Sequence, residues 1–142
     1  MGKGFAMNRV LLIDTDKEFA RALGMACLAG GIAIRLAENL CEGVRFMLDA
    51  PVSAVLVEAR VLRLAGPDQS RLFDIVAPGI PVVVTVAADA STEERVRLEL
   101  QGFTVVPKPF DIVELLAKLE PLARTRWTSR AAVAAEVDAL CG

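Results

Sequence analysis

The chain has 142 residues, a formal net charge of −2 and 54% hydrophobic residues. A chain of this length is most simply one domain, and its composition is that of a globular protein rather than a disordered one. The nearly balanced charge argues against broad nucleic-acid binding, and no apolar run reaches the roughly 18 residues that a membrane-spanning helix needs.

The sequence contains three cysteines and no histidine. Cys27, Cys41 and Cys141 are widely spaced, which favours free thiols in a reducing compartment. No apolar signal core precedes the first strand, so we expect a cytoplasmic protein. Zinc sites and histidine-based catalysis are nearly excluded. We expect Cys27 and Cys41 to be buried, because both fall in apolar helical patterns.

The first half of the chain alternates between strand and helix patterns. An apolar run over 9–14 predicts a strand, and residues 17–31 show helical spacing that stops at a glycine pair. A short strand over 32–36 precedes a helix over 39–50. A third strand over 53–58 ends in Glu58, and a third helix is predicted over 67–77.

The second half repeats the alternation. Residues 81–86 are β-branched, as in a strand buried on both faces. Ser91 and Glu94 have the spacing of a capping box and open a helix over 91–101. A strand over 103–107 and a helix over 111–122 follow. Five such units predict an α/β fold with a doubly wound, five-stranded parallel sheet, (βα)5 and flavodoxin-like.

Three charged residues fall at the ends of predicted strands. Asp14 follows the first strand, Glu58 ends the third, and Lys108 follows the fifth. In a doubly wound sheet, sites lie at the carboxyl ends of the strands, where the strand order reverses. We therefore expect these three residues to share one site. The alternative is three unrelated surface charges.

With these residues in place, the chain resembles a receiver domain of two-component response regulators over roughly residues 9–122. Receivers carry an acidic pair after the first strand, a phosphorylated aspartate after the third, a threonine or serine after the fourth and a lysine-proline after the fifth. Asp14 matches the first acid, and "VVPKPF" supplies Lys108 and Pro109, whose bond is usually cis in the family. Gly66 matches a family glycine eight residues after the acceptor position, Glu58.

At four positions that carry the function of receivers, this chain has a different residue type. Thr15 stands in place of the second acid, Glu58 at the acceptor position and Val86 at the hydroxyl position. Val105 occupies the position of the aromatic switch residue. Thr85 lies one place before Val86, and strand alternation predicts that it points away from the pocket. The resemblance implies a degenerate phosphoacceptor pocket formed by Asp14, Thr15, Glu58, Val86, Lys108 and Pro109.

These departures weaken the phosphoryl-transfer chemistry of the family. A divalent metal offsets the charge of the phosphoryl group, and Thr15 removes one negative charge from its carboxylate ligands. We therefore expect no cofactor, with weak Mg²⁺ binding at most. Asp16 could compensate, although it reads better as a helix N-cap. Glu58 either reaches Lys108 and holds a fixed negative charge or is an inert replacement.

The resemblance and its departures predict a stand-alone, non-enzymatic receiver that binds proteins independently of phosphorylation. In the family, partners or a second copy bind the face formed here by the helix over 91–101, the strand over 103–107 and the helix over 111–122. The expected partner is a kinase, an output protein or a second copy, with no membrane or nucleic acid. A working phosphoacceptor with an unusual site and a small-ligand or redox sensor are the alternatives.

The predicted organisation has three parts. Residues 1–8 form an N-terminal extension, 9–123 the receiver-like domain, and 124–142 a basic connector and C-terminal helix. The 19 residues after Ala123 are too few for an output domain of about 50 residues. Residues from about Thr128 to Leu140 are predicted to be helical and to dock an apolar stripe, preferably between two copies.

Overall fold

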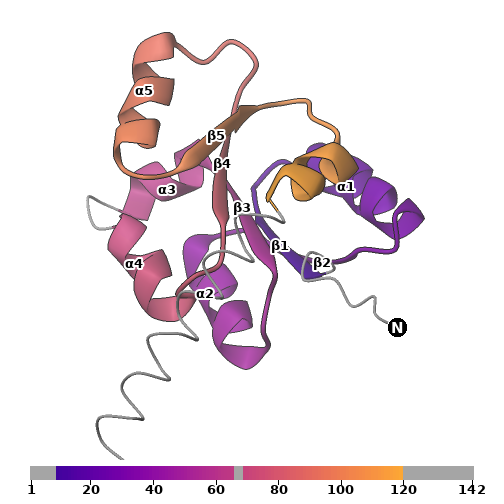
Figure 1. Cartoon of the computed structure of the whole chain (residues 1–142). Helices are drawn as coiled ribbons and strands as arrows, with labels where there is room; N and C mark the ends of the chain where they lie inside the picture. Colours follow the sequence, from indigo (N-terminus) through magenta and orange to yellow (C-terminus); the bar gives the residue numbers. More distant parts are fainter. Residues whose placement is uncertain (1–8, 66–68, 120–142) are drawn as a thin grey trace, which may run out of the picture.

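The five strands form one parallel sheet in the order β2-β1-β3-β4-β5 (Figure 1). The computed structural model describes residues 9–65 and 69–119. The strands are β1 (Arg9–Ile13), β2 (Ala33–Ala37), β3 (Ala54–Glu58), β4 (Val82–Val86) and β5 (Thr104–Pro107). The predicted doubly wound architecture is therefore confirmed.

Helices cover both faces of the sheet. α1 (Lys17–Ala29) and the helix of residues 112–119 pack on one face. α2 (Leu40–Asp49), α3 (Ala59–Ala65), α4 (Gln69–Val76) and α5 (Thr92–Leu100) lie on the other. Strand residues alternate between the two layers, because successive side chains point to opposite faces. Leu56 packs in the α1 layer, for example, and its neighbour Val57 packs in the other.

Side-chain caps start the helices where the sequence predicted. Asp16 caps α1, its Oδ1 accepting a hydrogen bond from the Phe19 N–H at 3.0 Å. The Ser91 hydroxyl accepts from the Glu94 N–H at 3.1 Å at the start of α5. These contacts satisfy backbone donors that have no partner within the helix. The N-cap role expected for Asp16 is therefore confirmed.

The segment after β3 differs from its sequence-based prediction. α3 begins at Ala59, directly after Glu58, whereas the sequence analysis placed the next helix at 67–77. Val61 and Leu62 of α3 are buried in the core, and α4 begins only at Gln69. The short α3 was missed because its apolar residues directly continue the apolar run of β3. This hides the change from the repeat of a strand to the repeat of a helix.

The prediction that both helical cysteines are buried is wrong for Cys41. Cys27 is buried, as expected, but Cys41 is exposed. The buried residues of α2 are Gly43 and Met47, which are one turn apart and face β1 and the core. Cys41 lies outside that stripe, because residues two positions apart on a helix point in different directions.

A methyl group at Gly43 is expected to destabilise the domain. Its Cβ would collide with Ile13 Cδ1 and lie 2.9 Å from Ile13 Cγ1, so α2 or β1 must move. We expect Gly43→Ala to lower the free energy of unfolding by about 1–2 kcal/mol, after allowing for alanine's better helix propensity. Gly24→Ala on α1 is the matched control: its Cβ meets no atom within 4 Å, and the gain is up to about 1 kcal/mol. Equal urea midpoints for the two variants would refute this packing argument.

Several predictions fall on residues that the structure does not describe. They concern the extension over 1–8, the family glycine at Gly66, and the tail with its predicted helix and Trp127. Within 9–65 and 69–119, no helix is both long enough and apolar enough to span a membrane.

Candidate functional site: a shared lysine at the carboxyl edge of the sheet

The three charged residues at strand ends meet at one edge of the sheet. β1 lies between β2 and β3, so the strand order reverses beside it, and Asp14 follows its last residue. Glu58 ends the neighbouring strand β3. The Lys108 N–H donates to the Val86 carbonyl at 2.9 Å, which holds the chain after β5 against the end of β4.

Lys108 forms ion pairs with both carboxylates. Its Nζ lies 2.8 Å from Asp14 Oδ2 and 3.7 Å from Glu58 Oε2. The contact to Asp14 is a close ion pair without the alignment of a good hydrogen bond. The side chains of Asp14, Glu58 and Lys108 are 0%, 13% and 17% exposed, so water screens them little. The predicted proximity of Glu58 and Lys108 is confirmed, and Asp14 is the nearer partner.

An aromatic ring completes the surroundings of the ammonium group. Lys108 Nζ lies 4.1 Å from the centroid of the Phe19 ring, within range of a cation–π interaction. Phe19 also meets Phe110 edge-on, with centroids 5.7 Å apart. Phe19 was not among the residues predicted for the site. Its place in the first turn of α1, just after Asp14, was the available signal.

The surroundings of Glu58 disfavour the charged form of its carboxyl. Burial raises the pKa of its carboxyl, and the nearby charge of Asp14 raises it further, whereas Lys108 and Arg60 act in the opposite direction. Asp16 contributes a smaller increase. Asp14 Oδ1 accepts a hydrogen bond from the Asp16 N–H at 2.8 Å, but Glu58 Oε1 has no hydrogen-bond partner among the described residues.

Removing the charge of Glu58 is expected to stabilise the domain at neutral pH. A raised carboxyl pKa means that the folded state binds the proton more tightly than the unfolded state, so wild-type stability falls as pH rises through the folded pKa. Glu58→Gln mimics the protonated form, and we expect a gain of about 1 kcal/mol at pH 8. The gain should shrink as the pH falls towards the unfolded pKa of about 4.3. Urea unfolding at several pH values checks it, and a pH-independent difference would contradict it.

Val86 and Val105, which the resemblance matched to the hydroxyl and aromatic positions of receivers, are apolar. Val86 is 2% exposed and Val105 is partly buried, and both pack in the layer of α2–α5. Thr15, at the position of the second acid, is exposed.

The prediction that Thr85 points away from the site is wrong. The sheet register pairs it with Glu58, and the residues two places earlier, Val83 and Leu56, belong to the same core layer. Because paired residues of parallel strands point to the same face, Thr85 lies beside Glu58 instead of pointing away from the site. Its hydroxyl is buried without a hydrogen-bond partner among the described residues. The prediction failed because alternation was counted from Val86 and not from the neighbouring strand.

The described residues do not fit the divalent cation that the family resemblance implies. Among the described residues, Asp14 and Glu58 are the carboxylates that pair with Lys108, and its ammonium lies next to both. Magnesium prefers several oxygen ligands in octahedral geometry. Within the described ranges, no three histidine, cysteine, aspartate or glutamate side chains are grouped to hold a metal. The Lys108-Pro109 bond is cis, as the resemblance predicted.

Comparison with known proteins points to one class. No protein-family model matches the chain. Response regulator MprA of Mycobacterium sp. (strain KMS) is 27% identical over 116 residues, which cover 82% of this chain and 50% of MprA. MprA of Mycobacterium ulcerans (strain Agy99) is 26% identical with the same coverage. The chain thus spans about half the length of these curated relatives.

Solved structures share the fold. A CheY-like receiver domain protein from Methanospirillum hungatei JF-1 superposes with a TM-score of 0.64 at 19% identity, covering 87% of this chain and 98% of that one. A two-component response regulator from Clostridium difficile gives a TM-score of 0.67 at 21% identity, covering 82% and 96%. The chain is thus similar in sequence to the response regulator MprA, and it shares the fold of solved receiver domains.

Proposed function

We propose that this receiver domain serves two-component signalling as a non-enzymatic, protein-binding module that phosphorylation does not switch. The observation that carries the proposal is the pairing of Lys108 with two carboxylates of its own chain, at 2.8 Å and 3.7 Å. In the family this lysine stands beside the phosphorylated residue. Here Glu58 supplies a negative charge at that place without any phosphoryl group.

Two further features support a fixed conformation. A receiver that switches needs a hydroxyl to follow the phosphoryl group and an aromatic residue to change rotamer in response. Val86 and Val105 offer neither a hydrogen-bonding group nor a large ring, and both are packed in the core layer. Val86 and Val105 therefore provide no relay towards β5, although Thr85 of β4 carries a buried hydroxyl beside Glu58.

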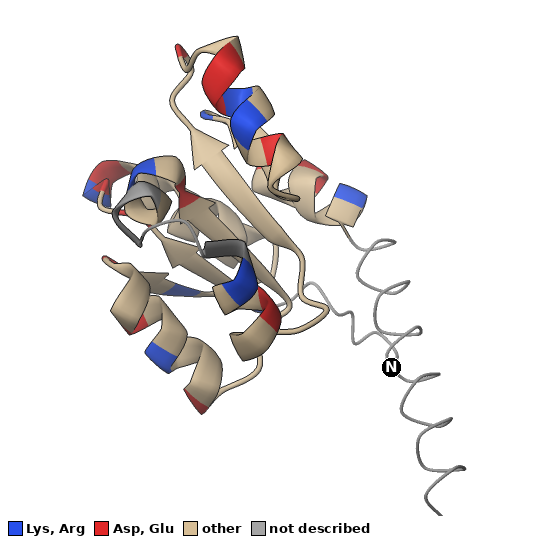
Figure 2. Ribbon diagram, turned by 90° about the vertical axis from the view of Figure 1, so that its left-hand side faces the viewer, with Lys and Arg blue, Asp and Glu red and all other residues tan. Residues whose placement is uncertain are grey.

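We propose that the partner binds the face of α5, β5 and the helix of residues 112–119. β5 is an edge strand of the sheet. Leu100 of α5 is 83% exposed and Val96 is 43% exposed, so apolar surface is available there. Figure 2 shows acidic and basic residues interspersed on α5. Glu93 and Arg97 of this helix form an exposed ion pair, and such charges would set the orientation of a partner. The partner is a signalling protein or a second copy; the similar NtrC4 receiver domain was solved as a dimer (TM-score 0.67, 17% identity, covering 84% of this chain and 99% of that one).

Incubation with a small phosphodonor tests the proposal. We expect the intact mass of the wild-type protein to stay unchanged in the presence of Mg²⁺, because Glu58 is displaced by about one methylene from the acceptor geometry and such an error costs about a hundredfold in rate. A phosphoryl adduct that disappears in Glu58→Ala would show a working phosphoacceptor and overturn the proposal.

Magnesium binding is expected to be weak. The Lys108 ammonium next to Asp14 and Glu58 repels a divalent cation, and Thr15 adds no charge. We expect calorimetry to detect no micromolar binding, and Lys108→Met to strengthen Mg²⁺ binding by removing the competing positive charge. Micromolar affinity of the wild type would contradict the account of the site.

A further inference from the structure

The outer side of β2 has no strand partner among the described residues. β2 stands at one end of the sheet, and β1 is the only described strand that pairs with it (Figure 1). The Ala37 carbonyl accepts a hydrogen bond from the Asp14 N–H at 3.0 Å, so the backbone groups of Ala37 point to β1. Because these directions alternate along a strand, the N–H and C=O groups of Ile34 and Leu36 point away from the sheet. Such unpaired groups are a template for a further strand.

The sequence of β2 does little to block this edge. Proteins protect exposed edges with proline or lysine, and β5, the other edge strand, ends in Pro107, which has no N–H. β2 has the sequence AIRLA and contains neither residue. Leu36 is 46% exposed and shares the face of its register partner Leu12, which packs in the α1 layer. The edge therefore offers main-chain groups and, on its α1 side, an exposed apolar side chain.

The opposite face of β2 is basic. In the sheet register Arg9 is paired with Ala33, and Arg35 is paired with Leu11, which packs in the layer of α2–α5. Because alternate residues of a strand share a face, Arg9 and Arg35 both point to that layer. Both arginines are exposed, and neither forms an ion pair with a described residue.

A pocket of about 280 Å³ lies beside the two arginines, between the first residues of β1 and β2 and the chain at the end of α2. Arg35 Cζ lies 4.5 Å from the centroid of the Phe46 ring, and Arg9 Nη1 donates to the Pro51 carbonyl at 3.5 Å. These contacts hold the guanidinium groups at the pocket without neutralising their charge. Two positive charges beside a pocket of this size suit the carboxylate of an acidic side chain.

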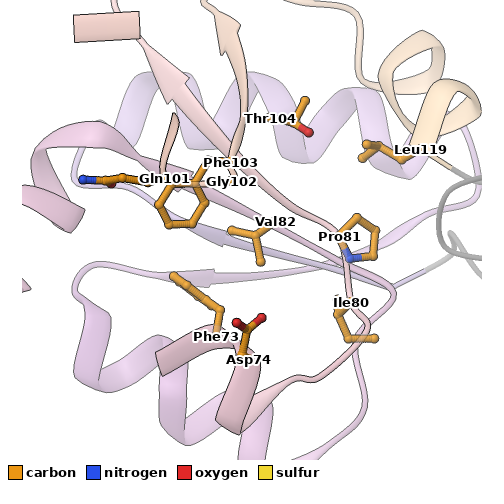
Figure 3. Close-up of a pocket in the computed structure, with 10 residues that line it drawn as sticks. All are labelled: Phe73, Asp74, Ile80, Pro81, Val82, Gln101, Gly102, Phe103, Thr104 and Leu119. Atoms are coloured by element: carbon orange, nitrogen blue, oxygen red, sulfur yellow. The ribbon is translucent and has the colours of Figure 1, made fainter. Parts of the chain in front are cut away.

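Another pocket, beside the start of β4 and β5, lacks these features. It measures about 160 Å³, and Figure 3 shows Asp74 and two aromatic residues among those that line it. The rings belong to Phe73 and Phe103, which are only 2% and 7% exposed. Accessible surface with a matching charge is therefore found at β2 and not at this pocket.

We propose that β2 is a docking edge for an extended segment of a partner protein, which adds to the sheet as a sixth strand. Its acidic side chains lie against Arg9 and Arg35, and its apolar side chains lie against Leu36. Side chains of an added strand alternate between the two faces, so the segment alternates acidic and apolar residues. A second copy fits less well, because two-fold pairing of two β2 edges brings two basic faces side by side. β2 and β5 are opposite edges of the sheet, so this site is separate from the partner face proposed above.

A short synthetic peptide of alternating valine and glutamate tests the proposal by NMR titration of the ¹⁵N-labelled full chain. We expect saturable shifts of the Ile34 and Leu36 amide resonances. Arg35→Glu should raise the dissociation constant at least about tenfold, because an acidic side chain then meets a like charge. Arg9→Glu with Arg35→Glu should instead bind a peptide of alternating valine and lysine. Arg71→Glu, which reverses an exposed charge on α4, is the matched control and should bind the glutamate peptide as the wild type does.

Two further changes separate strand addition from binding through side chains alone. N-methylation of every peptide residue keeps the charge of the peptide but removes its N–H donors, and it should abolish binding. Leu36→Pro removes an N–H donor from the edge and should weaken binding more than Leu36→Ala, which keeps that donor. Circular dichroism of each variant separates loss of binding from loss of folding.

Several results would overturn the proposal. One is the absence of saturable shifts up to about 1 mM glutamate peptide, where any remaining affinity is too weak for a specific edge. Others are binding that survives N-methylation and a wild-type protein that binds the lysine peptide equally well. A doubled mass in solution without peptide, with β2 resonances that depend on protein concentration, would make a second copy the occupant.

Discussion

Lys108→Met is expected to destabilise the domain by about 3 kcal/mol, the largest effect of any single change at the charged edge. The substitution leaves Asp14 and Glu58 without their shared counter-charge, and breaking a buried ion pair by removing one partner typically costs about 3–5 kcal/mol. The lower end applies because Lys108 is 17% exposed. Urea unfolding at pH 7 measures the effect.

A control and a rescue make this expectation specific. Lys118→Met removes an exposed pair with Glu114 and should cost less than about 0.5 kcal/mol. Adding Asp14→Asn and Glu58→Gln to Lys108→Met should recover most of the lost stability, since no unpaired charge then remains. A triple variant as unstable as Lys108→Met alone would show that packing of the lysine stem, and not its charge, stabilises the edge.

Restoring the family residues is expected to create a phosphoacceptor. Thr15→Asp supplies the second acid, Glu58→Asp shortens the acceptor and Val86→Thr returns the hydroxyl. With Mg²⁺ and a small phosphodonor, we expect the triple variant to gain one phosphoryl group at a rate at least about a hundredfold above the wild type, because acceptor position alone is worth about that factor. Intact mass against time gives the rate.

The intermediate variants identify what the site lacks. Glu58→Asp alone should react slowly, since the metal ligands are still incomplete. Adding Lys108→Met to the triple variant should reduce the rate again by removing the positive charge beside the phosphoryl group. A folded triple variant that acquires no phosphoryl group would contradict the inference that Thr15, Glu58 and Val86 keep the wild type from accepting one.

The sheet and the position of the site could be predicted from the sequence because both depend on long apolar runs and their ends. The strand patterns before Asp14, Glu58 and Lys108 place these residues at the carboxyl edge whatever their rotamers are. The preference of Lys108 for Asp14 over Glu58, at 2.8 Å against 3.7 Å, could not be predicted, because it depends on side-chain reach and on the Phe19 ring.

Two other failures have a common physical origin. The direction of Thr85 follows from its register opposite Glu58, and the exposure of Cys41 follows from the rotation of α2 over β1. Register and rotation are set by contacts between elements that are remote in the sequence, such as Ile13 against Gly43. A periodic pattern within one element does not contain that information.

The most direct test of the account is the amide NMR spectrum of ¹⁵N-labelled protein before and after a small phosphodonor and Mg²⁺ are added together. A domain that phosphorylation does not switch should give unchanged resonances for α5, β5 and the helix of residues 112–119, and these same resonances should move when a partner binds. A new set of resonances across these elements, appearing with a phosphoryl mass increase, would contradict the central claim.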